Sequence, residues 1–241
     1  MPPTHLFWRT FRPAEGFYTS EVEASPRRLP VRTFLPTGYE PNYAYPLLVF
    51  FHGHGGSEEQ ILRLAPRLSR RNYICIGLRG PEPMKPRHDD RPRFSWGAYS
   101  SCDAQVEEYL LQAVEQTRRN YHVHSERIYL AGVCEGASVA YRLGLFFAER
   151  FAGVISLNGS MPRGAGPVLR LPEARQLRVF IAHGIANTRT PLAAARDDWR
   201  LLYTAGLSVR LHTYPTTHRL HPDMLCDLNR WVVQTLNAPV Y

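Results

Sequence analysis

The stretch that decides the fold is RIYLAGVCEGASVAYRL, residues 127–143. Its first part, 127–133, is a mostly apolar run typical of a buried strand, and the residues after Cys134 read as a helix. A side chain at such a junction can be held in a sharp, strained turn if the residues two positions away are very small. Gly132 and Gly136 meet this condition. The segment therefore predicts a strand, a tight turn at Cys134 and a helix.

The rest of the chain repeats this alternation of strand and helix. Apolar runs predict strands at 29–35, 46–52, 73–78, 151–157, 178–184 and 207–214. Helices are expected after Ser57, which is a plausible N-cap, then near 103, over 191–204 and over 222–236. Pro66 should kink or end the first of these helices. The pattern predicts an α/β fold with a mostly parallel central sheet and helices on both faces.

Length and composition indicate an ordinary globular chain. Its 241 residues are 44% hydrophobic and 21% charged, which suits one domain with a substantial core. We expect residues 1–25 to be a polar N-terminal leader and residues 26–241 to form a single domain. No apolar run approaches the roughly 20 residues of a membrane span, and the N-terminus lacks the apolar region of a signal peptide. A cytoplasmic location is therefore expected.

The net charge of +8 invites the question of polyanion binding. Lys85 is the only lysine among the 29 basic residues, and the arginines are dispersed and interleaved with acids. Nucleic-acid binding would predict a basic face with stacking aromatics or a known reader module, and no such module is present. We therefore expect a basic surface and no nucleic-acid partner.

The cysteines and histidines do not predict a metal centre. The four cysteines, which are Cys75, Cys102, Cys134 and Cys226, form no CxxC pair and fit neither a disulfide framework nor a structural zinc site. The HxH pair of His52 and His54 is not accompanied by an acid in a metallohydrolase pattern. No metal and no cofactor are expected.

Five stretches together resemble a known family. They are LLVFFHGHGG (47–56), RIYLAGVCEGASVAYRL (127–143), FAGVISLNGSMP (151–162), VFIAHGIANTRTP (179–191) and YPTTHRLHPDML (214–225). In this order they resemble the α/β-hydrolases and are similar to the phospholipase/carboxylesterase family of small esterases. The cysteine at the turn, where serine is usual, resembles dienelactone hydrolase on the same fold. The resemblance implies the α/β-hydrolase fold and cofactor-independent cleavage of an ester.

The resemblance also assigns roles to the residues around the turn. Cys134 is the expected nucleophile. Two backbone N–H groups would hold the oxyanion, those of Glu135 and, in the turn after the first core strand, His54. Gly53 and Gly55 would let the backbone approach the substrate closely.

The remaining members of the triad follow in chain order. His218 is the expected base, because it lies between the strand 207–214 and the last helix; His212 and His221 are its competitors. The family pattern HG-x-x-D aligns on residues 183–187, where Asn187 replaces the aspartate. Asp197 and Asp198 fall inside the next helix and fit this role less well.

The two departures from the family pattern make chemical sense together. A comparable Asp→Asn change in a serine protease lowers kcat by about 10⁴, because the histidine adopts the wrong tautomer. A thiol at a helix N-terminus beside a histidine can ionise before the substrate arrives, so the histidine needs orientation more than an anionic partner. Papain-like proteases use such a Cys-His-Asn set on an unrelated fold. Loss of catalysis would produce the same two changes.

We therefore expect a hydrolase that acts on an ester or thioester of a small acyl group, with a catalytically inactive binding protein on the same fold as the alternative. Trp96 could line the acyl pocket or anchor its loop. The segments 80–97 and 160–177 are expected to shape substrate choice. The sequence does not indicate an oligomeric state.

Overall fold

The computed structural model describes residues 16–85, 91–97, 103–162 and 173–237. Its strands are β1 (Gly16–Ala24), β2 (Arg27–Leu35), β3 (Tyr45–Phe51), β4 (Ile74–Leu78), β5 (Glu82–Met84), β6 (Arg93–Ser95), β7 (Val123–Val133), β8 (Gly153–Leu157), β9 (Arg178–Gly184) and β10 (Ser208–Tyr214). Its helices are α1 (Glu58–Leu62), α2 (Ala65–Leu68), α3 (Asp103–Asn120), α4 (Glu135–Phe146), α5 (Leu192–Thr204) and α6 (Pro222–Leu236), with short 3₁₀ turns η1 (Ala148–Arg150) and η3 (Glu173–Gln176).

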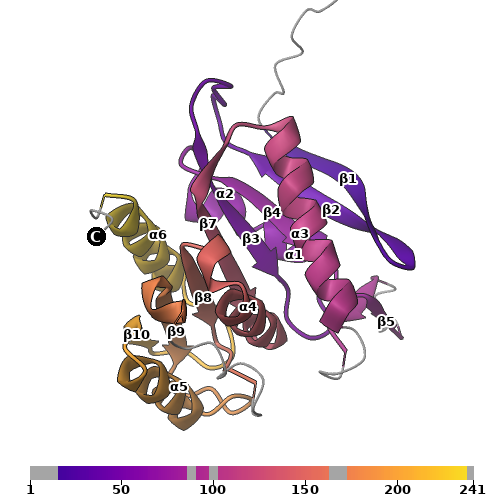
Figure 1. Cartoon of the computed structure of the whole chain (residues 1–241). Coiled ribbons are helices and arrows are strands. Elements are labelled where there is room, and N and C mark those ends of the chain that lie inside the picture. The colour runs from indigo at the N-terminus through magenta and orange to yellow at the C-terminus, as the bar shows by residue number, and fades with distance from the viewer. Residues whose placement is uncertain (1–15, 86–90, 98–102, 163–172, 238–241) are drawn as a thin grey trace, which may run out of the picture.

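Eight strands form one sheet in the order β1-β2-β4-β3-β7-β8-β9-β10 (Figure 1). The six strands from β4 to β10 run parallel, whereas β1 and β2 are antiparallel to their neighbours. A separate pair, β5 and β6, forms a small antiparallel ribbon. The predicted mostly parallel sheet is confirmed.

Helices cover both faces of the sheet, and the apolar runs of the central strands explain why. Along β3, Leu47, Val49 and Phe51 face one core cluster, whereas Leu48 and Phe50 face the other. The first cluster includes buried residues of α3, α4 and α5, and the second includes residues of α1, α2 and α6. A strand covered on both faces has no polar face, so its sequence shows no alternation.

The beginning of the chain differs from the prediction. The expected leader over 1–25 includes β1, which pairs with β2 along its whole length from Gly16↔Leu35 to Ala24↔Arg27. Exposed residues alternate with more buried ones along this strand. An edge strand with one solvated face carries many polar residues, and this composition reads as a polar leader. Residues 1–15 lie outside the described ranges.

The local signals around the first helix are confirmed. The Ser57 side chain accepts a hydrogen bond from the N–H of Gln60, so Ser57 caps α1. The helical region breaks between Leu62 and Ala65, and Pro66 lies in the first turn of α2, where its missing N–H costs no hydrogen bond. Across the described ranges, no helix combines the length and apolar character needed to cross a bilayer.

Candidate active site

Parallel strands bring their carboxyl ends to one edge of the sheet, and most of the predicted site residues lie there. The turn 52–56 follows β3, Cys134 follows β7, Asn187 follows β9 and His218 follows β10. Neighbouring strand order places β3 beside β7, and β9 beside β10. The fold therefore gathers segments that are more than 150 residues apart in the sequence.

Cys134 occupies a strained turn between β7 and α4. Its backbone has φ 54° and ψ −117°, a conformation that residues with a side chain rarely adopt. A Cβ atom on Gly132 would lie 2.1 Å from the carbonyl oxygen of Gly136, and one on Gly136 would lie 2.2 Å from that of Phe51. Both glycines are therefore required by the close packing of backbone on backbone. The thiol is free and partly exposed.

The turn after β3 packs directly against Cys134. A Cβ atom on Gly53 would lie 3.2 Å from the Cβ of Cys134, and Gly55 has a positive φ of 75°. The N–H groups of Gly55 and Gly56 are used within this region, by the carbonyls of Phe94 and Gly53. Gly53 and Gly55, which were predicted to let the backbone approach the substrate, thus lie in a turn that packs on Cys134.

A side-chain contact joins His54, in the turn after β3, to Glu135, the first residue of α4. His54 Nδ1 lies 3.3 Å from Glu135 Oε2, and Ser95 Oγ donates to Glu135 Oε1 at 2.8 Å. Glu135 is the first residue of α4, so its N–H has no acceptor within the helix. The two residues predicted to hold an oxyanion through their backbone are thus linked through their side chains.

His218 is bound to Asn187, as the sequence predicts. The distance from His218 Nδ1 to Asn187 Oδ1 is 3.0 Å. The same oxygen lies 3.1 Å from the N–H nitrogen of Arg189 and 3.2 Å from that of Thr190. Because backbone N–H groups only donate, the atom that they contact must be the amide oxygen. His218 therefore donates from Nδ1, and its Nε2 is left as the acceptor.

The environment favours neutral His218. Burial is the main cause that lowers the pKa of His218 below its usual value, and the positive charge of Arg189 adds to the effect. Near pH 7 the imidazole is therefore uncharged, with a lone pair on Nε2.

His183 completes the surroundings of Asn187. His183 Nε2 lies 2.8 Å from the Thr190 carbonyl, which only accepts, so this nitrogen carries a proton. The amide Nδ2 of Asn187, 3.4 Å away, therefore faces a second donor. An aspartate at position 187, as in the family pattern, could accept a hydrogen bond from this Nε2–H of His183.

The competing residues have other partners. His212 lies 3.5 Å from Asp227, and His221 caps α6 by accepting from the N–H of Asp223. Asp198 accepts from the N–H of Met161, and Asp197 pairs with Arg200 on the surface of α5. These contacts support His218 and Asn187 over their alternatives.

Trp96 anchors its loop against the end of β3. Its side chain is 3% exposed, its Nε1 donates to the His52 carbonyl at 2.8 Å, and its ring packs on those of Phe51 and His52. A residue held in this way cannot line an open pocket, so the structure does not support the substrate-binding role. Parts of the segments 80–97 and 160–177, and Cys102, lie outside the described residues.

Sequence reasoning missed Asn158, the residue after β8. It is fully buried, has a positive φ of 55°, and bonds through its side chain to Gly184 and Arg219. The pair Asn158-Gly159 is a turn signal, but it carries no information about these distant partners.

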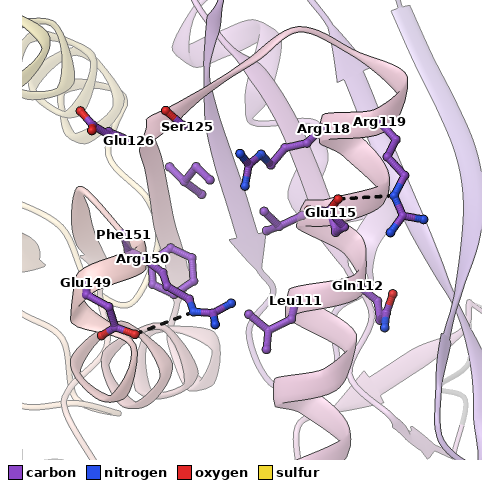
Figure 2. Close-up of a pocket in the computed structure, with 12 residues that line it drawn as sticks. Leu111, Gln112, Glu115, Arg118, Arg119, Ser125, Glu126, Glu149, Arg150 and Phe151 are labelled. Atoms are coloured by element: carbon purple, nitrogen blue, oxygen red, sulfur yellow. Dashed lines mark hydrogen bonds and ion pairs between the residues drawn. The ribbon is translucent and has the colours of Figure 1, made fainter.

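A pocket of about 590 Å³ lies away from this edge (Figure 2). It is formed by α3, the beginning of β7 and residues 149–151, at the amino ends of the strands. Its charged side chains include the pairs Arg119–Glu115 and Arg150–Glu149. None of the predicted site residues lines this pocket. Within the described ranges, no three His, Cys, Asp or Glu side chains form a group that could hold a metal ion.

The central sheet and its helices form the α/β-hydrolase fold, which the solved neighbours share. The family model described as Phospholipase/Carboxylesterase matches residues 40–236, and the chain belongs to this family. The chain is therefore assigned to a hydrolase family.

Relatives with known descriptions agree with this membership. The chain is 25% identical to Acyl-protein thioesterase 1 of Mycosarcoma maydis over 223 residues, which cover 79% of this chain and 91% of the relative. It is 26% identical over 147 residues to "Probable carboxylesterase" of Oryza sativa subsp. japonica, covering 58% of this chain and 55% of that relative. The crystal structure of the Bacillus cereus carboxylesterase aligns with a TM-score of 0.67 at 19% identity, covering 86% of this chain and 94% of that one. This last likeness shows the fold.

Proposed function

We propose that the chain is a cofactor-independent hydrolase that cleaves a carboxylic ester or thioester of a small acyl group. Cys134 is the nucleophile, His218 the general base and Asn187 the residue that orients His218. The backbone N–H groups of His54 and Glu135 hold the oxyanion. The observation that carries this proposal is the hydrogen bond between His218 and an Asn187 oxygen that two backbone N–H groups hold in place.

The reaction would proceed in two half-reactions. The Cys134 sulfur forms a bond to the acyl carbon while its proton passes to His218 Nε2, and the negative charge develops on the carbonyl oxygen. Collapse of this intermediate breaks the bond to the leaving group, which takes the proton from His218. A water molecule then attacks the thioester on Cys134 and gives its proton to His218. Release of the acid restores the thiol and the neutral imidazole.

A neutral amide at 187 is compatible with this chemistry. In a serine enzyme an asparagine fails mainly because it turns the histidine to the wrong tautomer. Here the backbone N–H groups of Arg189 and Thr190 hold the oxygen toward His218, which favours the productive tautomer. The missing negative charge still leaves the imidazolium less stabilised. A thiol compensates because it loses its proton far more readily than a serine hydroxyl does.

The proposal is tested by turnover of p-nitrophenyl acetate. Cys134→Ala and His218→Ala are each expected to lower kcat by about 10²- to 10⁴-fold, the usual contribution of a nucleophile or a general base. Cys226→Ala, which removes an exposed thiol on α6, is the matched control and should retain full activity. If the first two variants hydrolyse the ester as fast as the unmodified protein, the assignment is wrong. Thermal stabilisation by esters without any turnover would instead indicate a binding protein.

A second measurement examines the thiols directly. Cys134 is expected to be the most rapidly alkylated cysteine under native conditions, because it is partly exposed at a helix N-terminus, at the same edge of the sheet as His218. Cys75 should react slowest, because burial raises the pKa of its thiol. Mass spectrometry after a short treatment with iodoacetamide gives the rates for each cysteine. Equal labelling of Cys134 and Cys226 would contradict the proposed reactivity.

A further inference from the structure

We infer that Asn158 is a positioning residue for this reaction: its side-chain amide fixes the loop that carries His218 relative to the strand edge that carries Cys134. This inference rests on the proposed function. Asn158 follows β8, which lies between β7 and β9 in the sheet. It therefore stands between the segment that holds the thiol and the segments that hold Asn187 and His218.

Each polar atom of the Asn158 side chain has a defined partner on a different segment. Its Oδ1 accepts from the N–H of Gly184, at the end of β9, at 2.8 Å. Its Nδ2 donates to the carbonyl of Arg219, the residue after His218, at 3.0 Å. Because an N–H only donates and a carbonyl only accepts, these partners fix the orientation of the amide.

The backbone around Asn158 connects it to Cys134. The N–H of Cys134 donates to the carbonyl of Leu157 at 3.0 Å. A Cβ atom on Gly159 would lie 2.4 Å from the Cys134 carbonyl oxygen, so the chain on this side also touches the strained turn. The three residues 157–159 thus hold Cys134 through the backbone and the histidine loop through one side chain.

Asparagine suits this position for three separate reasons. The φ of 55° is accessible to asparagine, aspartate and glycine but costly for most other residues. The fully buried site needs one acceptor and one donor on the same short side chain. An ionised aspartate supplies only acceptors and would face the Arg219 carbonyl without a hydrogen to donate. Glycine permits the backbone but removes both bonds.

These differences provide the test variants. Asn158→Gly keeps the backbone conformation and deletes the link, whereas Asn158→Asp keeps the bond to Gly184 and loses the one to Arg219. Both are expected to lower kcat by about 10- to 100-fold with KM changed less than twofold, because small displacements of a reacting group have effects of this size. The acid limb of the kcat/KM profile should move to higher pH, toward the usual pKa of a solvated histidine, because the loop that carries His218 becomes more solvated.

Tyr73→Phe is the matched control for loss of a buried hydrogen bond. The Tyr73 hydroxyl, at the opposite edge of the sheet, donates to the side chain of Asn229 at 2.8 Å. This variant should lower the melting temperature and leave kcat and the pH profile unchanged. If it lowers kcat as much as the Asn158 variants do, their effect is only a loss of stability and the inference is overturned.

A readout independent of turnover separates this inference from the proposed function. Imidazole ¹⁵N NMR of the intact protein should show one His218 tautomer, with the proton on Nδ1, and a mixture in Asn158→Gly. Retention of the single tautomer and of full kcat in both variants would overturn the positioning role while leaving the proposed function in place. If activity is lost in Cys134→Ala and His218→Ala but not in the Asn158 variants, the positioning role is likewise overturned and the proposed function stands.

Discussion

Asn187 illustrates how a contact between two residues can be predicted from the sequence while its surroundings cannot. The alignment of the HG-x-x-D pattern placed an amide next to the histidine, and the structure shows the bond to His218. The sequence did not show that two backbone N–H groups select the oxygen of that amide. Nor did it show that the Nε2–H group of His183 faces the nitrogen of that amide, because such contacts depend on how the turn 184–190 folds.

Asn187→Asp tests the electrostatic part of this environment. A carboxylate beside His218 would stabilise the imidazolium, so the pKa of His218 should rise. In the unmodified protein the acid limb of kcat/KM should lie below pH 6.5, because the pKa of His218 is lowered. In Asn187→Asp the acid limb of kcat/KM should move to higher pH. An unchanged limb would mean that residue 187 does not act on the catalytic base.

His52 stabilises the edge of the sheet at which the candidate site lies. Its side chain is 1% exposed, donates from Nδ1 to the Gly53 carbonyl and accepts the N–H of Gly80 at Nε2. It thus ties the end of β3 to the segment after β4. Burial lowers the pKa of His52 from 6.5 to about 4.

A pH dependence of stability follows from this shift. Between pH 6.5 and about 4 the unfolded chain binds a proton that the folded chain excludes, so the free energy of unfolding should fall as the pH is lowered through this range. The loss is about 3 kcal/mol in total, at 1.36 kcal/mol per pKa unit. Urea unfolding across this pH range measures it. His52→Gln, which cannot titrate, should show a flatter profile; an equally steep one would assign the dependence to other groups.

The elements themselves were predictable to different degrees. The central strands β3, β4 and β9 are apolar along their length because both faces are covered, and their sequences identified them to within about one residue. β1 was missed because an edge strand with a solvated face resembles a polar leader. Trp96 could not be assigned, because its burial depends on the His52 carbonyl and the Phe51 ring, both distant in sequence.

For the whole molecule, the order of the strands explains how the candidate site is assembled. Cys134, Asn158, Asn187 and His218 follow β7, β8, β9 and β10, which are consecutive neighbours in the sheet. The resemblance in five separate stretches predicted three of these four residues. Asn158 was not predictable because its role lies in contacts between strand ends.

The pairing of cysteine with asparagine is tested most directly by a double-mutant cycle of Cys134→Ser and Asn187→Asp, measured as kcat for p-nitrophenyl acetate. We expect Cys134→Ser alone to lose at least about 100-fold, because a serine hydroxyl needs the carboxylate that this chain lacks. Asn187→Asp should then raise kcat at least about tenfold more in the serine background than in the cysteine background, a coupling of about 1.4 kcal/mol. Equal effects of Asn187→Asp in both backgrounds would contradict the idea that the thiol is what allows a neutral amide to serve.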